Sequence, residues 1–180
     1  SSYLIAHSST GINKSEEFPG EIAGKTFTFG SKGSTSGRLM PEYHIRQHLL
    51  TAPNKVFAKV GFSGDHSRTI ALVQSGAYQV GAVNYKVWDT AVAAGKIDSS
   101  KVKVIWQTPR YPDYQWTVRG DVANRFGADF QQRLTDALLN MSDPELLASF
   151  PRQSFIKADN ALYKPIFDTA VAIGLIDTRP

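Results

Sequence analysis

Lys25-Thr26-Phe27-Thr28-Phe29, followed by Gly33-Ser34-Thr35-Ser36-Gly37, is the stretch that decides the fold. The first part predicts a β-strand, and the second places three hydroxyl side chains and two glycines in the turn from that strand to a helix. Backbone N–H groups at a helix start carry partial positive charge, and Ser and Thr hydroxyls donate further hydrogen bonds. The turn therefore predicts a cradle for a phosphate-like oxyanion, with a simple helix N-cap as the alternative.

Strand patterns alternate with helical patterns on either side of this turn. We expect strands at residues 4–6, 26–29, 56–60, 80–84 and 102–106, and helices at residues 41–50, 65–74 and 85–94. This alternation is typical of an α/β fold with a largely parallel sheet, which should end near Arg110. One more strand is expected at residues 115–118, and helices from Val122 onward. Because Pro41 would cost a helix a backbone bond, the regular helix should begin only near Met40.

Two helix ends resemble each other. Residues 87–98 and 166–177 both read as an Ala-rich helix, then a glycine, then an apolar residue. Gly95 and Gly174 therefore predict glycine C-caps, a local solution that occurs twice.

Composition limits the function classes. With 42% hydrophobic and 20% charged residues, the chain of 180 residues is typical of a globular protein. It contains no cysteine, which excludes disulfides, thiol catalysis and thiolate metal sites. The net charge of +4 favours anionic partners, but Lys and Arg are scattered along the chain, so we expect no nucleic acid partner. No cofactor is expected.

His66 is the second candidate for the site. It follows Ser63-Gly64-Asp65 and precedes the apolar positions Ile70 and Val73, which places it in the first turn of a helix. If both helix starts lie at the same end of a parallel sheet, Ser34, Thr35, Ser36 and His66 converge on one crevice. His44 and His48 have the i, i+4 spacing of metal ligands but lack the acidic context of such a motif, so no metal site is expected.

A family resemblance rests on a series of motifs. They are Gly24-Lys25 before a strand, Ser34-Thr35-Ser36-Gly37 with Pro41, His66, Gly76 with Val80-Gly81-Ala82, and Tyr111-Pro112-Asp113-Tyr114. The chain resembles the PhnD-like substrate-binding proteins of phosphonate and phosphite ABC transporters, which are type II periplasmic binding proteins. The resemblance implies a mixed, mostly parallel sheet flanked by helices, with hinge strands and C-terminal helices.

The same resemblance implies which residues bind the ligand. Ser34, Thr35 and Ser36, with Gly37 in their turn, and His66 would hydrogen-bond the phosphonate oxygens. Gln79 stands where aminophosphonate receptors carry an aspartate that meets the ligand amine. An uncharged Gln79 favours a ligand without an amine, such as phosphite, phosphate or a simple alkylphosphonate.

The resemblance also implies a domain organisation. Residues 1–118 would form the second α/β lobe, with hinge strands at residues 3–6 and 115–118. Residues 119–180 would form a C-terminal helical segment that packs on a first lobe, which this sequence does not include. Leu134, Leu138 and Met141 follow helical spacing, and such a stripe would favour a dimer or a partner fragment.

The function implied is the periplasmic solute-binding component of an ABC transporter that captures a phosphonate, phosphite or related phosphorus oxyanion. Its partners would be that small anion and an ABC permease, and it would be periplasmic, or lipid-anchored outside the cytoplasmic membrane. No catalysis is expected. The alternatives are a ligand-sensing domain of a regulatory or signalling protein with the same fold, and an enzyme such as a phosphate-ester hydrolase.

Overall fold

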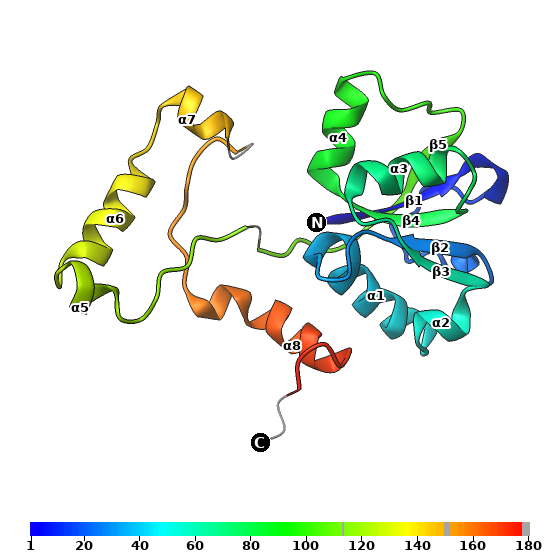
Figure 1. Cartoon of the computed structure of the whole chain (residues 1–180). Coiled ribbons are helices and arrows are strands. Elements are labelled where there is room, and N and C mark those ends of the chain that lie inside the picture. Colours follow the sequence, from blue (N-terminus) through cyan, green and yellow to red (C-terminus); the bar gives the residue numbers. More distant parts are fainter. Residues whose placement is uncertain (113, 150–151, 178–180) are drawn as a thin grey trace. The chain divides into compact units, whose positions relative to one another are not determined.

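The computed structural model describes residues 1–112, 114–149 and 152–177 (Figure 1). The chain divides into two compact units. One comprises Ser1–Tyr111 together with Pro165–Pro180, and the other comprises Pro112–Lys164. The α/β region therefore ends next to the predicted Arg110, but the last helix returns to it, which the predicted boundary at residue 118 did not anticipate.

A single five-stranded sheet forms the centre of the first unit, in the order β3-β2-β4-β1-β5. The strands are β1 (Ser2–His7), β2 (Thr26–Phe29), β3 (Lys59–Phe62), β4 (Val80–Asn84) and β5 (Val102–Gln107). β2 is parallel to β3 and β4, whereas β1 is antiparallel to β4 and β5. Four strands therefore share one direction, which confirms the predicted mixed, mostly parallel sheet.

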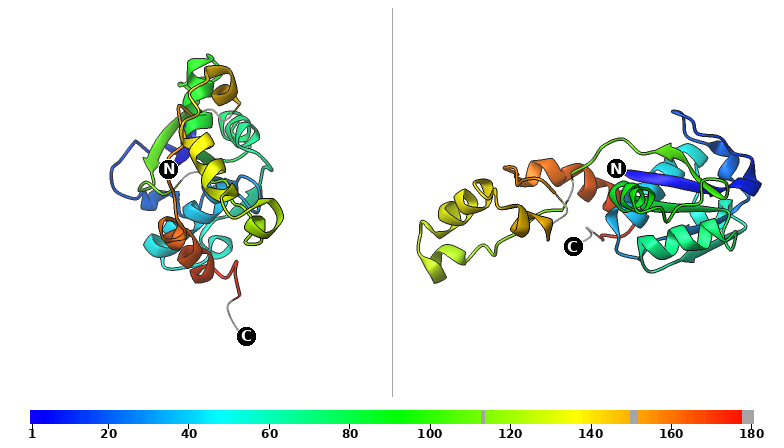
Figure 2. Two further views of the ribbon diagram at one scale, coloured as in Figure 1. Left: turned by 90° about the vertical axis from the view of Figure 1, so that its left-hand side faces the viewer. Right: turned by 90° about the horizontal axis from the view of Figure 1, so that it is seen from above.

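Helices cover both faces of the sheet (Figures 1 and 2). α1 (Met40–Leu49) and α2 (Pro53–Val56) lie on one face, and α3 (His66–Gln74) and α4 (Tyr85–Ala93) on the other. Side chains along β1 point alternately to the two faces of the sheet. Leu4 and Ala6 belong to the core under α1, and Ile5 belongs to the core under α3 and α4. This burial of apolar side chains is the main force that holds the layers together.

Two predicted strands differ from the structure. Residues 56–60 were predicted as one strand, but α2 extends to Val56 and β3 begins at Lys59. Pro53 suits a helix start, and the Phe57 N–H donates to the Pro53 carbonyl at 3.0 Å, which closes this helical turn instead. Residues 115–118 form no strand. Asp113, part of the tyrosine-rich motif, lies outside the described residues.

The second unit is helical. It contains α5 (Val122–Phe126), α6 (Phe130–Leu139), α7 (Pro144–Ala148) and the 3₁₀ turn Asn160–Tyr163. Leu134, Leu138 and Met141, the predicted stripe, are half-buried. Other apolar side chains of this unit are more open to solvent: Phe126, Leu146 and Ile156 are 56%, 53% and 80% exposed.

The last helix, α8 (Lys164–Ala172), contributes to the first unit. Its Ala170 is buried with Leu39 and Met40 in a small apolar cluster. Both predicted glycine C-caps are present: Gly95 and Gly174 have φ of +67° and +73°, and the N–H after each donates back to a helix carbonyl. Within the described parts of the chain, no helix combines the length and apolarity needed to cross a membrane.

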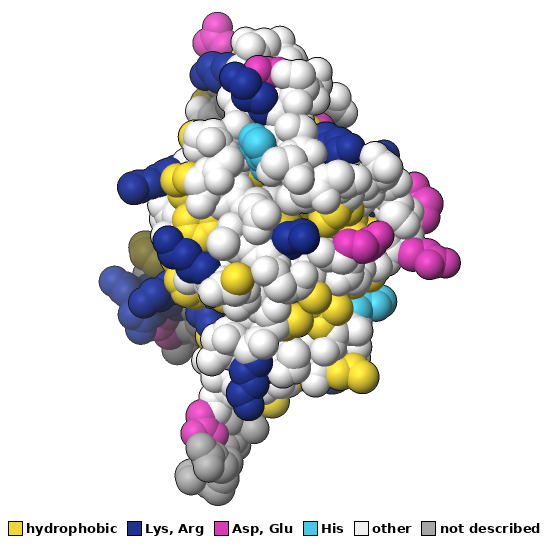
Figure 3. Space-filling view, turned by 90° about the vertical axis from the view of Figure 1, so that its right-hand side faces the viewer, with side chains coloured by type: hydrophobic (Ala, Val, Ile, Leu, Met, Phe, Trp, Pro, Cys, Tyr) yellow, Lys and Arg dark blue, Asp and Glu magenta, His cyan; other side chains and the backbone are white. Residues whose placement is uncertain are grey.

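Basic side chains are spread over the face drawn in Figure 3 rather than gathered in one stripe. This matches the scatter of Lys and Arg along the sequence.

Candidate functional site

The hydroxyl-rich turn is a single π-helical turn, Thr35–Leu39, that runs directly into α1. The Ser34 hydroxyl caps it by accepting a hydrogen bond from the Gly37 N–H at 2.9 Å. The wide turn suits Pro41, which cannot donate a backbone hydrogen bond. As predicted, the regular helix begins at Met40.

Pro41 has no N–H to donate to this turn, and two carbonyls of the turn accept hydrogen bonds from groups outside the helix. The Gly37 carbonyl accepts from the Gly30 N–H at 2.9 Å. The Ser36 carbonyl accepts from the hydroxyl of Ser2, a fully buried residue at the start of β1, at 2.7 Å. The Ser2 hydroxyl also lies 2.8 Å from the Tyr111 hydroxyl. The turn is thus anchored to the sheet and to the segment after β5.

Gly37 is required by close packing. A Cβ at this position would lie 2.9 Å from Ser34 Oγ, closer than Cβ atoms approach other atoms, and 3.0 Å from His66 Cε1, tighter than most Cβ contacts. The turn and the histidine ring therefore approach each other only because residue 37 has no side chain.

His66 is the first residue of α3 and follows Asp65, whose carboxylate caps the helix by accepting from the Arg68 N–H at 2.8 Å. Its Nε2 lies 3.4 Å from Ser36 Oγ, and its Nδ1 accepts from the Asn84 N–H at 3.3 Å. Burial lowers the pKa of His66, while the charge of Asp65 acts in the opposite direction. The ring therefore favours the neutral form.

Asn84, the last residue of β4, is a site residue that the sequence reasoning missed. It is buried, and its Nδ2 donates to Ser36 Oγ at 3.2 Å. Its Oδ1 caps α4 by accepting from the Lys86 N–H at 2.9 Å. A signal was available, because Asn84 is the polar residue between the apolar run 80–83 and a predicted helix, where parallel strands present ligand sites.

The structure thus brings Ser34, Ser36, Gly37 and His66 together at the carboxyl ends of β2, β3 and β4. Thr35 lies in the same turn, and within the described residues its hydroxyl has no hydrogen-bond partner.

Gln79 does not join this group. It precedes β4, so it lies at the opposite end of the strand, about 16 Å from Asn84 for five residues of extended chain. Its Oε1 accepts from the Thr26 N–H at 3.1 Å, and its own N–H donates to Thr26 Oγ1 at 2.9 Å. Gln79 therefore lies apart from Ser36 and His66, and its contact with the ligand stays a prediction.

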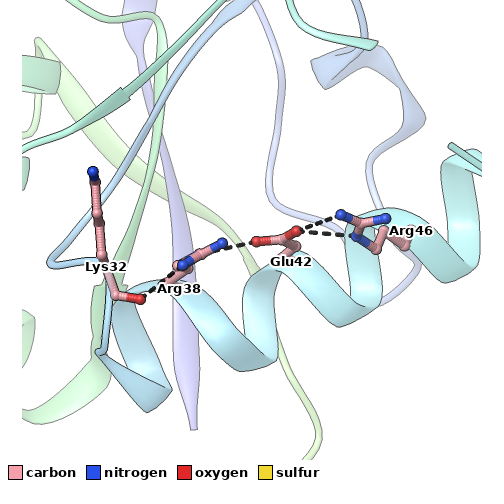
Figure 4. A network of polar contacts seen from close by, with 4 residues as sticks. All are labelled: Lys32, Arg38, Glu42 and Arg46. Atoms are coloured by element: carbon pink, nitrogen blue, oxygen red, sulfur yellow. Dashed lines mark hydrogen bonds and ion pairs between the residues drawn. The ribbon is translucent and has the colours of Figure 1, made fainter. Parts of the chain in front are cut away.

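A buried carboxylate links the turn to α1 (Figure 4). Glu42, in the first turn of α1, is only 4% exposed and accepts from Arg38 Nε at 3.1 Å and from Arg46 Nη2 at 2.8 Å. Arg38 Nη1 in turn donates to the Lys32 carbonyl at 3.0 Å. The loop before the turn and the helix after it are thereby tied together.

The site is rich in hydrogen-bond donors. Hydroxyls from the turn and an imidazole converge on one edge of the sheet, and no carboxylate hydrogen-bonds to Ser36, His66 or Asn84 among the described residues. Such an arrangement suits a small anion with several acceptor oxygens. The part of the chain that the structure describes holds no group of three or more His, Asp or Glu residues able to bind a metal ion.

Comparison with known proteins identifies the family. Residues 1–163 match the family described as ABC transporter, phosphonate, periplasmic substrate-binding protein. The chain belongs to this phosphonate-binding family. The resemblance predicted from the motifs is therefore confirmed, and the family consists of transporter binding proteins rather than enzymes.

A curated relative of this family is the probable ABC transporter phosphite binding protein PhnD1 of Prochlorococcus marinus strain MIT 9301. It is 43% identical over 145 residues, which cover 78% of this chain and 49% of the relative. This chain therefore spans about half the length of the relative.

Solved structures confirm the type II binding-protein fold. PhnD1 from the same organism, in complex with methylphosphonate, has a TM-score of 0.84 and 37% identity over 97% of this chain and 67% of that one. A binding protein component of an ABC phosphonate transporter from Pseudomonas aeruginosa has a TM-score of 0.69 at 21% identity, over 95% of this chain and 56% of that one, and shows the shared fold.

Proposed function

We propose that this protein is the solute-binding component of an ABC importer and captures a phosphonate, phosphite or related phosphorus oxyanion. The observation that carries the proposal is the meeting of the capped hydroxyl turn with His66 at one edge of the sheet. Family membership and the methylphosphonate complex of the PhnD1 relative support the same ligand class. Ser34, Thr35, Ser36, Gly37 and His66 would contact the ligand oxygens.

The ligand class is one without an ammonium group. The uncharged Gln79, which favours such a ligand in the sequence, hydrogen-bonds to Thr26 at the amino end of β4. The structure offers a different reason: Asn84, a neutral amide, lies beside Ser36 and His66, and no carboxylate of the described residues hydrogen-bonds to these three side chains. The Asp65 carboxylate, whose charge acts on His66, is engaged as the cap of α3. Phosphite, phosphate and methylphosphonate fit this chemistry better than 2-aminoethylphosphonate.

The partners and location follow from the same proposal. The loaded protein would deliver its anion to an ABC permease, and it would work in the periplasm or attached by a lipid outside the cytoplasmic membrane. The exposed apolar side chains of the unit Pro112–Lys164 would then pack on a partner fragment or on a second copy of this chain. Light scattering after size-exclusion chromatography distinguishes a monomer from a dimer.

Calorimetry tests the function. The protein is titrated with phosphite, phosphate, methylphosphonate and 2-aminoethylphosphonate, and tight binding of one amine-free anion is expected. A second sample joins the chain to the part of PhnD1 that it does not match, so that a complete cleft is available. Absence of heat with all four anions in both samples would contradict the proposed function.

A further inference from the structure

The side chain of Asn84 has only one orientation that satisfies its contacts. Its amide oxygen accepts from the Lys86 N–H at 2.9 Å and from the Val87 N–H at 3.4 Å, as the N-cap of α4. The amide nitrogen is therefore the atom that faces Ser36, 3.2 Å from Oγ. Since an amide N–H₂ can only donate, Ser36 Oγ must accept this hydrogen bond.

The backbone of Asn84 determines the proton on His66 in the same way. Its N–H points at His66 Nδ1, at 3.3 Å, so that Nδ1 accepts and carries no proton. A neutral imidazole then bears its proton on Nε2. The lowered pKa of this buried ring agrees with the neutral form.

Ser36 Oγ is consequently approached by two donors, Asn84 Nδ2 at 3.2 Å and His66 Nε2 at 3.4 Å. A hydroxyl has one proton and two acceptor positions. Because both acceptor positions face donors, the proton of Ser36 must point away from these two residues. A single residue thus sets the proton positions of both of its neighbours.

We propose that Asn84 is a positioning residue that turns the Ser36 hydroxyl into a hydrogen-bond donor toward the ligand, directly through its amide and indirectly by fixing the proton of His66 on Nε2, so that only an anion presenting acceptor oxygens fits there. The identity of the anion in this inference rests on the proposed function. The proton positions of Ser36 and His66 do not, because they follow from contacts within the protein. A protonated ligand oxygen would meet a donor where it needs an acceptor.

Asn84→Asp tests the proposal with little change in shape. The carboxylate keeps the helix cap, because Asp and Asn are equally good N-caps and a negative charge favours a helix start. Its second oxygen can only accept, so the Ser36 proton turns toward it and away from the ligand. Methylphosphonate affinity is expected to fall about 100-fold or more through the lost donor and the added repulsion. Asn84→Ser, which keeps a capping hydroxyl without the carboxylate charge, should weaken binding about tenfold.

Asn54→Asp is the matched control, because it makes the same charge change at an exposed position of α2. Its affinity should stay within about twofold of the parent protein, since exposed charges are screened by solvent. Equal methylphosphonate affinity in Asn84→Asp and Asn54→Asp would overturn the proposal. Circular dichroism and the unfolding midpoint verify that both variants fold.

Nitrogen NMR of the ligand-free full chain provides the second readout. The His66 ring should be neutral with its proton on Nε2 at pH 7, and His66→Gln assigns the signal. A proton on Nδ1 would overturn the proposal whether or not any anion binds. Correct proton positions in a protein that binds none of the four anions would support the positioning role and count against the proposed function alone.

Discussion

At the amino ends of β2 and β4, Thr26 and Gln79 hydrogen-bond to each other. At the carboxyl ends of the same strands, hydrogen-bond donors remain available for a ligand. Each residue of the Thr26–Gln79 pair gives one backbone N–H to the other's side chain, at 3.1 and 2.9 Å. At the carboxyl end, Ser36 Oγ receives two donors and keeps its own proton. The closed pair stabilises the fold, and the surplus of donors is what can bind an anion.

Replacement of Ser36 or His66 at the carboxyl end should have the largest effect on anion binding. Ser36→Ala and His66→Ala are expected to bring anion binding below detection, because the first removes the donor hydroxyl and the second removes the imidazole that orients it. Calorimetry with methylphosphonate measures the loss, and circular dichroism confirms the fold. Unchanged affinity for methylphosphonate in both variants would contradict the assignment of the site.

Gly37→Ala should destabilise the carboxyl end of the strands through a steric clash. The new Cβ would press on Ser34 Oγ and His66 Cε1, so the turn and the ring must separate. We expect a loss of about 1–3 kcal/mol of unfolding free energy together with at least tenfold weaker binding. Chemical denaturation and calorimetry measure the two effects. Gly33→Ala, where a Cβ meets no atom within 4 Å, is the control and should leave both nearly unchanged.

Ser2→Ala tests whether the anchor of the turn matters. It leaves the buried Ser36 carbonyl without its donor at 2.7 Å. We expect a destabilisation of about 1–2 kcal/mol, with a smaller loss of affinity than Ser36→Ala causes. Denaturation by urea gives the free energy of unfolding. Full stability would show that another group replaces the Ser2 hydroxyl.

Acid should destabilise the fold through His44, which lies on α1 and at neither end of these strands. Burial, aided by the charge of His48, lowers the pKa of His44 on α1 to about 4, from an ordinary 6.5. The unfolded chain therefore takes up a proton first as the pH falls. Stability should be complete above about pH 6.5 and decrease by about 1–2 kcal/mol toward pH 4, after allowance for solvent screening of the partly exposed ring. Urea denaturation at several pH values measures this, and His44→Asn should flatten the dependence.

Gln79→Ala should have the smallest effect on binding. It removes one hydrogen bond at the amino end, with an expected cost of about 1 kcal/mol in stability and no change in anion affinity. Parallel calorimetry of this variant and Ser36→Ala contrasts the two ends directly. A large loss of affinity in Gln79→Ala would show that Gln79 contacts the ligand, as the family resemblance implied.

Local signals predicted most of the fold correctly. β2 and β4 have their predicted bounds, α1 begins at Met40 because of Pro41, and two glycines end their helices as expected. The strand near residues 56–60 was misplaced because Pro53 starts a short helix there, and residues 115–118 were wrongly predicted as a strand. In each case the apolar run alone could not specify which backbone partner it would find.

The candidate site was predicted in part. The hydroxyl turn and His66 lie at helix starts as predicted, because helix starts after strands have a recognisable pattern, whereas their contact with a ligand stays a prediction. Gln79 was chosen from a family position, and the strand direction places it at the amino end of β4, away from the hydroxyl turn. Asn84 was missed because its importance depends on two neighbours that lie 48 and 18 residues away in the chain.

The sequence by itself determined the elements and the chemical character of the turn, because caps, prolines, glycines and apolar periodicity act over a few residues. The tertiary structure alone decided that β2, β3 and β4 end side by side, which brings Ser36, His66 and Asn84 within hydrogen-bonding distance. It also decided which atoms donate and which accept, since proton positions depend on contacts between residues that are distant in the chain.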